Sequence, residues 1–450
     1  MNEELARIAE RIVASAAPGE EVEAYVTTGQ HTDIRVMDGA LDSLTTATSS
    51  SVAVRIVSDH QQGISVAGTL DPDAVDEAMS AARENLRYSA VDEHVRLATL
   101  ADTGGESADS LDVWCDDVLG TATSSKVALA MELDAQTRSR DDRVDRVESS
   151  DYGDSAGETV ILNSNGVQVY RRRTTAGISV VALADEGSTA YSGYGFSVGR
   201  AFSDLQLEEA VKRAVERAAG MLGARPIGTA RMRVVFDPLV SRSFIGLLAS
   251  MLNGDALVRG RALFADRVGE PVASETVTLV EDPRDVNSFG AAATDAEGLA
   301  TKPITLIDGG VLRAFLHNLY TGSRAGSGST ASATRSPSVP PGVGVRGLRL
   351  QPGNQDPQRL LAEIGHGIYV ESLSGLHSGT NVVTGDFSVG AQGHVIRDGA
   401  LAEPFREITI ASTIPKMLLD LTGVANDTTW LSGSTAGNTI AFSEMSVSGS

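Results

Sequence analysis

Histidine, cysteine and acidic side chains are the residues of this chain that could bind a catalytic metal ion. A common helical metal motif places two histidines roughly three to five positions apart, with a glutamate nearby as the general base. The seven histidines are His31, His60, His94, His317, His366, His377 and His394. The closest pair, His366 and His377, is eleven positions apart, and Cys115 is the only cysteine. The sequence therefore contains no local metal motif, although a site assembled from distant histidines and aspartates stays open.

Motifs for nucleophilic catalysis and for phosphate binding are equally weak. A serine nucleophile usually lies in a Gly-x-Ser-x-Gly turn between a strand and a helix, but Gly326-Ser327-Gly328 lies in a Gly/Ser-rich loop. Cys115 is followed by two aspartates, whose charges oppose thiolate formation. The sequence has no glycine-rich motif for a dinucleotide and no P-loop. No conventional catalytic motif therefore points to an activity of this chain.

Composition and charge exclude several classes of protein. The net charge of the 450 residues is −22, whereas a nucleic-acid binder needs a basic face. The run Arg171-Arg172-Arg173 is the one short basic candidate, and we interpret it as solvated charges at the end of a strand. The first seventeen residues lack the apolar stretch of a signal peptide, and no run approaches the ~18 apolar residues of a spanning helix. We expect a cytoplasmic protein that binds neither nucleic acid nor membrane.

Hydrophobic periodicity predicts an α+β fold in which helices alternate with β-meanders. The predicted elements of the first half are helices near 4–15 and 72–86, strands over 21–69, helices over 124–138 and 204–221, and strands over 142–198. Helix–meander–helix thus occurs twice, which suggests an internal duplication. For residues 21–69 we expect four or five short strands, with turns at Asp38-Gly39 and Gln62-Gly63.

The second half of the sequence is richer in strands. A linker over 223–230 leads us to expect an N-terminal α+β domain over 1–227 and a β-rich C-terminal domain with few helices over 228–450. Asp237-Pro238 opens an apolar helix that ends near residue 252. A Gly/Ser/Pro-rich loop is expected over 325–344.

The segment 381–412, NVVTGDFSVGAQGHVIRDGALAEPFREITIAS, has the alternation of a half-buried strand followed by a second strand. Its start would place Val383, Phe387 and Val389 on one face, and Thr384, Asp386 and Ser388 on the other. Asp398-Gly399 is a good hairpin turn. The polar face fits a solvated sheet surface, and it also fits the wall of a groove that pairs with an extended peptide.

Four stretches resemble the TldD/PmbA family, whose members are also known as modulators of DNA gyrase. They are residues 381–412 together with LLDLTGVANDT, residues 234–272, PITLIDGGVLRAFLHNLYTGSRAG, and GALDSLTTATSSSVAVRIVSDHQQGISVAG. Residues 234–272 are most similar to the PmbA (TldE) branch. The resemblance covers nearly the whole chain.

The resemblance implies a metal site that this chain lacks. Members of the TldD branch carry His-Glu-x-x-x-His on the helix after the first strand of the C-terminal domain, and a cysteine near the C-terminus completes the metal site. The corresponding helix here, PLVSRSFIGLLASML, contains no histidine and no glutamate, and residues 424–450 contain no cysteine. Zinc hydrolysis needs ligands for the ion and a base for the proton of water. We therefore expect no catalytic and no metal-binding residue in this chain.

The family resemblance also implies a role for such a chain. Chains of the TldE type pair with a TldD-type chain, and the heterodimer degrades or trims unfolded peptides in an internal channel, with zinc in the TldD-like partner. On this hypothesis the chain is a non-catalytic subunit that encloses the channel. The candidate channel residues are Asn381, Thr384, Asp386, Ser388 and His394. At His394 the family usually has one residue of an aromatic pair.

Two alternatives stay open. The chain could act as a homodimeric hydrolase with an unrecognised site, for which Asp386 and His377 are polar candidates near the expected groove. It could also act as a peptide-binding adaptor that needs no partner.

Overall fold

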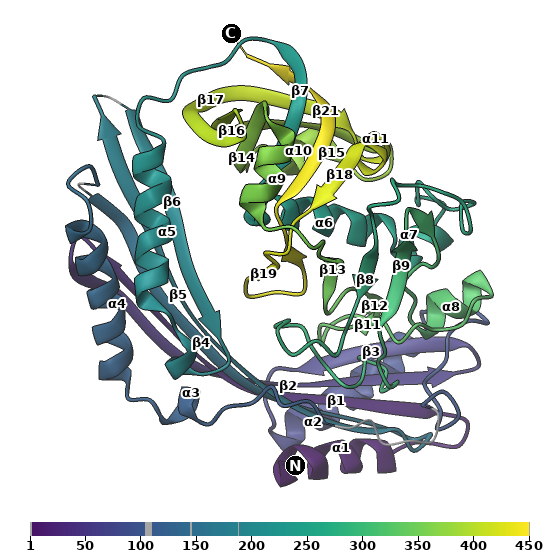
Figure 1. Ribbon diagram of the computed structural model, residues 1–450. Coiled ribbons are helices and arrows are strands. Elements are labelled where there is room, and N and C mark those ends of the chain that lie inside the picture. Colours follow the sequence, from purple (N-terminus) through teal and green to yellow (C-terminus); the bar gives the residue numbers. More distant parts are fainter. Residues whose placement is uncertain (1, 104–109, 145, 188, 450) are drawn as a thin grey trace.

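The computed structural model describes residues 2–103, 110–144, 146–187 and 189–449, and it confirms the α+β fold class. An antiparallel sheet of six strands, in the order β3-β2-β1-β4-β5-β6, dominates the N-terminal half. In Figure 1 this sheet curves down the left side and along the bottom, and the C-terminal half lies on its inner side. The elements of this half are α1 (Glu3–Ala14), β1 (Glu21–Met37), β2 (Ala40–Ser58), β3 (Gln61–Ala67), α2 (Pro72–Leu86), α3 (Asp117–Gly120), α4 (Thr123–Ser139), β4 (Arg146–Asn163), β5 (Gln168–Glu186), β6 (Thr189–Gly199), a 3₁₀ turn at Phe202–Asp204 and α5 (Leu207–Gly220).

The six-stranded sheet is built from two similar halves that meet at the pair β1–β4. Helices α1 and α2 pack on β1–β3, and their apolar side chains share one core with that part of the sheet. Helices α4 and α5 do the same for β4–β6. In each half, the third strand lies at the edge of the sheet and the first strand lies at the centre, so the helix–meander–helix pattern occurs twice in space as well as in sequence.

The strands of the first half are fewer and longer than the sequence pattern predicted. Residues 21–67 form three strands, not four or five, and the turn at Asp38-Gly39 is confirmed, with φ of 49° and 71°. The second turn was placed wrongly: it lies at Asp59-His60, with φ of 48° and 61°. Gly63 lies inside β3, where a Cβ would come within 1.9 Å of the Ala82 carbonyl oxygen on α2. This glycine permits close packing of helix on strand and not a turn.

A closed ring of strands forms the centre of the C-terminal half. The order β14-β7-β21-β17-β16 closes because β14 also pairs with β16, and the one parallel pair is β7–β14. A second sheet has the order β10-β9-β8-β13. The elements are β7 (Ala230–Phe236), α6 (Pro238–Met251), α7 (Gly254–Val258), β8 (Leu279–Glu281), β9 (Ile304–Asp308), β10 (Val311–Leu312), α8 (Leu319–Ala325), β11 (Ala333–Thr334), β12 (Gly342–Val343), β13 (Leu348–Leu350), α9 (Pro357–Ile364), β14 (Gly367–Ser374), α10 (Leu376–Gly379), β15 (Thr380–Asn381), β16 (Asp386–Arg397), β17 (Ala400–Thr413), α11 (Ile414–Asp420), β18 (Leu421–Val424), β19 (Thr429–Trp430), β20 (Ala436–Gly437) and β21 (Ile440–Ser448).

The segment 381–412 behaves largely as its alternation predicted. Phe387 and Val389 are buried, whereas Val383 is 47% exposed because it precedes β16 in a turn. The hairpin turn at Asp398-Gly399 is confirmed, with φ of 50° and 77°. The division of the chain at 227/228 stays a prediction; the six-stranded sheet ends with β6, and β7 begins the next one.

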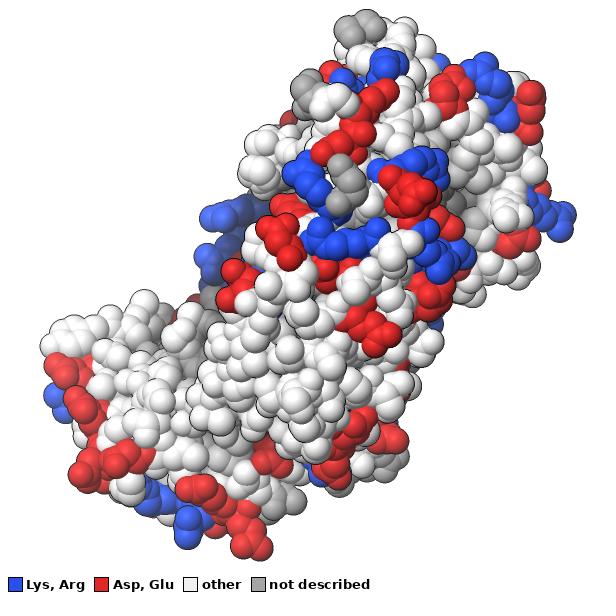
Figure 2. All heavy atoms as spheres, turned by 90° about the vertical axis from the view of Figure 1, so that its left-hand side faces the viewer, with Lys and Arg blue, Asp and Glu red and all other residues white. Residues whose placement is uncertain are grey.

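The surface carries charges of both signs. Figure 2 shows acidic and basic side chains interspersed at the two ends of one face, with a broad uncharged area between them. No continuous basic surface lies on this face, as expected for a net charge of −22. Among the described residues, no helix combines the length and the apolar character that a bilayer crossing requires.

Candidate functional site

The family resemblance implied that a metal site would lie on the helix after the first strand of the C-terminal half, and that helix is α6. Asp237 caps its N-terminus by accepting a 2.9 Å hydrogen bond from the backbone N–H of Leu239, and Pro238 begins the helix. One face is buried in the C-terminal core through Val240, Ser241, Phe244, Ile245, Leu248 and Met251. The helix contributes no histidine, cysteine, aspartate or glutamate.

The described residues contain no alternative metal site. No group of three or more histidine, cysteine, aspartate or glutamate side chains lies close enough together in the described part of the chain to hold an ion. The residues around α6 therefore do not fit a resident zinc ion.

A cavity of about 370 Å³ lies between α6 and the six-stranded sheet. Leu239, Val240 and Ser243 of α6 line one side of this cavity. The other sides come from Val181, Ser192, Tyr194, Arg217, Met221, Glu371, Ser372, Leu373, Leu376 and Gln392. The cavity thus lies where the N-terminal and C-terminal halves meet, and α6 supplies apolar and hydroxyl groups to it.

A charged network beside this cavity joins α5 to the C-terminal half. Arg217 donates a 2.7 Å hydrogen bond to Oδ2 of Asp237, and the Tyr369 hydroxyl donates to the same oxygen at 3.0 Å. Burial, followed by the charge and hydrogen bond of Asp237, raises the pKa of Tyr369 well above its ordinary value. Asp237 therefore serves as a helix cap and as the acceptor for two side chains at once.

His394 belongs to this junction and does not lie on an open strand face. Its Nε2 lies 3.0 Å from the carbonyl oxygen of Gly220, at the end of α5, and its Nδ1 lies 3.4 Å from Oε1 of Glu371. Burial alone would lower the pKa of His394, but the hydrogen bond and charge of Glu371, together with the Gly220 carbonyl, raise it. The side chain thus bridges the two halves of the molecule.

The other four candidate channel residues lie at the opposite end of β16. Asn381, Thr384, Asp386 and Ser388 are all exposed. The Asn381 side-chain oxygen accepts hydrogen bonds from two backbone N–H groups of the following turn, and the Thr384 hydroxyl donates to Asp386 at 2.6 Å. Eight residues of extended strand separate Asp386 from His394, a distance of about 26 Å. The structure therefore does not bring the five together, and their contact with peptide stays a prediction.

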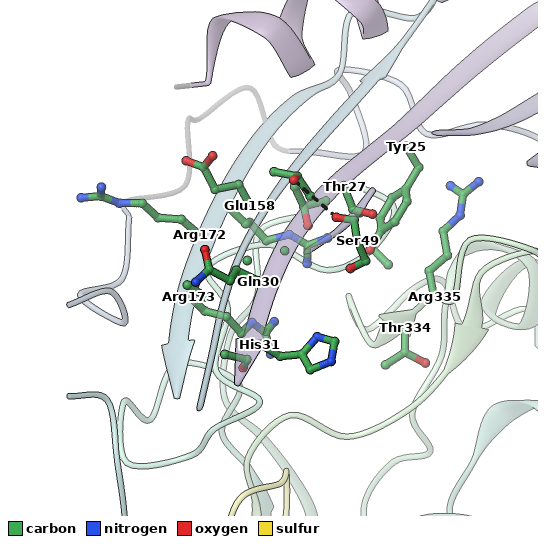
Figure 3. A pocket seen from close by; sticks show the side chains of 18 of the residues that line it. Tyr25, Thr27, Gln30, His31, Ser49, Glu158, Arg172, Arg173, Thr334 and Arg335 are labelled. Atoms are coloured by element: carbon green, nitrogen blue, oxygen red, sulfur yellow. Dashed lines mark hydrogen bonds between the residues drawn. The ribbon is translucent and has the colours of Figure 1, made fainter. Parts of the chain in front are cut away.

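A second cavity, of about 490 Å³, was not foreseen from the sequence. Figure 3 shows it between the middle of the six-stranded sheet and the segment that carries Thr334 and Arg335. We call it the arginine pocket, because Arg171, Arg173, Arg335 and Arg346 line it; Arg172 also lines it, but its side chain extends away from the others in Figure 3 and lies against Trp114. Glu158 is its one acidic lining residue.

The interpretation of Arg171-Arg172-Arg173 as solvated charges at a strand end was wrong. The three residues lie inside β5, which runs from Gln168 to Glu186, and Arg171 and Arg173 are half-buried. Burial lowers the pKa of both side chains, and repulsion from Arg171 lowers that of Arg173 further. Alternation within the predicted strand places Arg171 and Arg173 on one face, and this pattern could have indicated a pair of arginines directed toward the same side of the sheet.

Comparison with known proteins identifies the family. Family models described as PmbA/TldA metallopeptidase domain 1, central domain and C-terminal domain match residues 22–86, 117–222 and 229–449. The chain belongs to the PmbA/TldD family. It is 25% identical over 448 residues to a protein named metalloprotease PmbA from Escherichia coli O157:H7, with 99% of this chain and 96% of the relative covered. A PmbA homologue from Haemophilus influenzae is 23% identical over 444 residues, with 97% and 94% covered.

Solved structures share the fold of this PmbA/TldD family member over its whole length. A Thermotoga maritima protein described as a modulator of a DNA gyrase aligns with a TM-score of 0.90 at 23% identity, covering 98% of this chain and all of that one. TldE from Thermococcus kodakarensis aligns with a TM-score of 0.86 at 22% identity, covering 99% of each chain.

Proposed function

We propose that this chain is a non-catalytic, TldE-type subunit of a heterodimeric metallopeptidase. Its partner is a TldD-like chain that holds zinc, and the heterodimer cleaves or trims unfolded peptides in an enclosed channel. The observation that carries the proposal is α6. In a member of the PmbA/TldD family, this helix has an apolar buried face, and its remaining positions supply no metal ligand and no general base.

Physical reasoning supports a role in which this chain contributes shape and binding. A metallopeptidase needs ligands that fix the ion and a base that takes the proton from water. The described residues include no cluster of three or more histidine, cysteine, aspartate or glutamate side chains that could hold an ion. The chain nevertheless presents several cavities against its large sheet, among them those of about 490 and 370 Å³ described above, which suit a wall that faces substrate.

Co-expression with a TldD-like protein tests the proposal. We expect the two chains to co-purify, and we expect cleavage of an unstructured peptide only when both are present. As a matched control, replacing the two motif histidines of the TldD-like chain should abolish cleavage and zinc content while leaving the complex intact.

Two results would contradict the proposal. One is that the chains do not associate and this chain changes no peptidase activity. The other is that purified chain alone cleaves peptide, which would favour the homodimeric hydrolase. Peptide binding by the isolated chain without any association would favour the adaptor.

A further inference from the structure

Five arginines line the arginine pocket, and Glu23 pairs with Arg335 while the charges of Asp295 and Glu281 act on Arg346. Arg171 and Arg173 project from one face of β5, while Arg335 and Arg346 approach from the C-terminal half. Repulsion from Arg171 and Arg173 adds to burial in lowering the pKa of Arg346 to about 10. Glu158, the acidic lining residue, already accepts hydrogen bonds from the Tyr170 hydroxyl and the Asn2 amide, at 2.5 and 2.6 Å.

Two of these arginines carry hydrogen-bond donors that no described residue accepts. The Arg335 side chain is fully buried; its Nη1 donates to Glu23, its guanidinium carbon lies 4.9 Å from the centre of the Tyr25 ring, and its Nε and Nη2 have no acceptor among the described residues. Nη2 of Arg346 donates to the Ala333 carbonyl at 2.6 Å, whereas its Nε likewise lacks a described acceptor. These three donors are closed to solvent, so they add positive charge beside the pocket, while the groups that a ligand can contact must come from the half-buried arginines of β5.

Among the described residues, each of the two β5 arginines donates to one backbone carbonyl, and most of its N–H groups have no described acceptor. Nη1 of Arg171 donates to the Thr294 carbonyl at 3.4 Å, and Nη1 of Arg173 donates to the Phe289 carbonyl at 3.2 Å. A guanidinium has five N–H donors in a planar fork that matches the two oxygens of a carboxylate. The backbone carbonyls thus hold these side chains in place without satisfying them.

We propose that the arginine pocket binds a carboxylate group of a peptide. Thr27, Gly29 and Ser49, with Ser155 on β4, line the pocket beside the arginines with small and hydroxyl-bearing groups. A lining of this kind leaves room for an extended chain, and the cavity of about 490 Å³ holds a few residues of it. The inference rests on the proposed function, because it takes the substrate to be a peptide and adds which of its groups the subunit recognises.

Three peptides, used with the purified full-length chain in calorimetry, test this inference. The first is an acetylated ten-residue peptide of uncharged residues with a free C-terminal carboxylate. The second is the same peptide amidated at its C-terminus, and the third is the amidated peptide with one internal glutamate. We expect at least one carboxylate-bearing peptide to bind about tenfold more tightly than the uncharged one, with a preference that weakens as salt is added.

The variants Arg171→Gln and Arg173→Gln should remove most of this preference. Arg172→Gln is the matched control: it lies between them, but its guanidinium carbon lies 5.1 Å from the centre of the Trp114 ring, and Figure 3 shows its side chain extending away from the others. Circular dichroism and thermal unfolding of each variant confirm that it is folded. Equal binding of all three peptides overturns the inference, as does a preference that survives both variants or is lost equally in Arg172→Gln.

Inorganic phosphate distinguishes a peptide site from a site for a free anion. If phosphate binds the wild-type chain with a dependence on Arg173 while the three peptides bind alike, the pocket holds a small anion and the inference is wrong. Association with a TldD-like chain is measured separately. Intact co-purification without any carboxylate preference would overturn this inference and leave the proposed function standing.

Discussion

Asp237 offers a sharp test of how the two halves of the molecule are joined. The residue caps α6, accepts a 2.7 Å hydrogen bond from Arg217 and a 3.0 Å hydrogen bond from Tyr369, and is 7% exposed in its side chain. Asp237→Asn keeps an acceptor for the helix cap but removes the charge that faces Arg217. Asp237→Ala removes the cap and both side-chain contacts.

The expected losses follow from these contacts. A hydrogen bond to a charged group contributes about 2 kcal/mol to stability here. This value is in the lower part of the usual range, because the Arg217 side chain is 23% exposed. We therefore expect Asp237→Asn to lower the free energy of unfolding by about 2 kcal/mol. A lost cap costs about 1 kcal/mol, and an unpaired Tyr369 hydroxyl about 1 kcal/mol more, so Asp237→Ala should cost about 4 kcal/mol.

Thermal and denaturant unfolding measure the effect. For 450 residues that unfold together, the unfolding entropy is about 0.9 kcal/mol/K, so these losses lower the Tm by about 2 and 4 °C. Asp356→Ala is the matched control, because Asp356 also caps a helix that begins with proline, accepts a 2.9 Å hydrogen bond from a backbone N–H and is exposed. It should cost only about 1 kcal/mol.

The double variant Arg217→Met/Asp237→Asn isolates the ion pair. If the pair contributes as described, the double variant is less destabilised than the sum of the two single variants by about 1–2 kcal/mol. Additive single effects, or equal losses in Asp237→Ala and Asp356→Ala, would refute the idea that this contact joins the halves.

Two further predictions concern ionisable groups at other places in the fold. The pKa of His394 is raised in the folded state, so protonation of His394 stabilises the fold. This stabilisation is complete below the ordinary histidine pKa of about 6.5 and is lost as the pH rises through the pKa of the folded state. The difference in Tm between wild type and His394→Gln should therefore shrink from about pH 6 to pH 8, and a constant difference would contradict the prediction. Lys126 and Asp154 form an ion pair of 2.5 Å in which each side chain is 4% exposed. Lys126→Met leaves the Asp154 carboxylate buried without its partner, so it should lower the free energy of unfolding by about 3–5 kcal/mol, and Lys126→Met/Asp154→Asn should recover part of this loss. If Lys126→Met does not lower the free energy of unfolding, the prediction is wrong.

Local patterns predicted the elements of this fold better than its contacts. Period-3.6 patterns identified the longer helices, and turn residues identified the hairpin at Asp398-Gly399, because these elements are specified by neighbouring residues; the short helices α3, α7, α8 and α10 were not predicted. They failed where a distant element decided the role of a residue. Gly63 was interpreted as a turn, since its packing against α2 is visible only in three dimensions.

The candidate site shows the same limit. The absence of ligands on α6 could be read directly from the sequence, because it concerns one helix. The position of His394 against Gly220 could not, since the two residues are 174 positions apart. The arginine pocket is lined both by Arg173 of β5 and by Arg335 of a segment remote in the sequence. Alternation along β5 carries no information about the position of that remote segment.

Helix α6 also explains how a member of this family can lack metal ligands and keep its fold. Ser241 donates a 2.6 Å hydrogen bond to the Asn438 carbonyl and accepts one of 3.0 Å from the Asn438 N–H. At Gly437 a Cβ would come within 1.8 Å of the Pro238 carbonyl oxygen, so the helix start is pressed against β20. These contacts, together with the cap at Asp237, fix the helix without any coordinated ion. Many metal sites supply folding free energy, and loss of their ligands unfolds the protein. Here hydrogen bonds and close packing among the described residues hold the wall beside the cavity, which is the physical condition that the proposed non-catalytic subunit must meet.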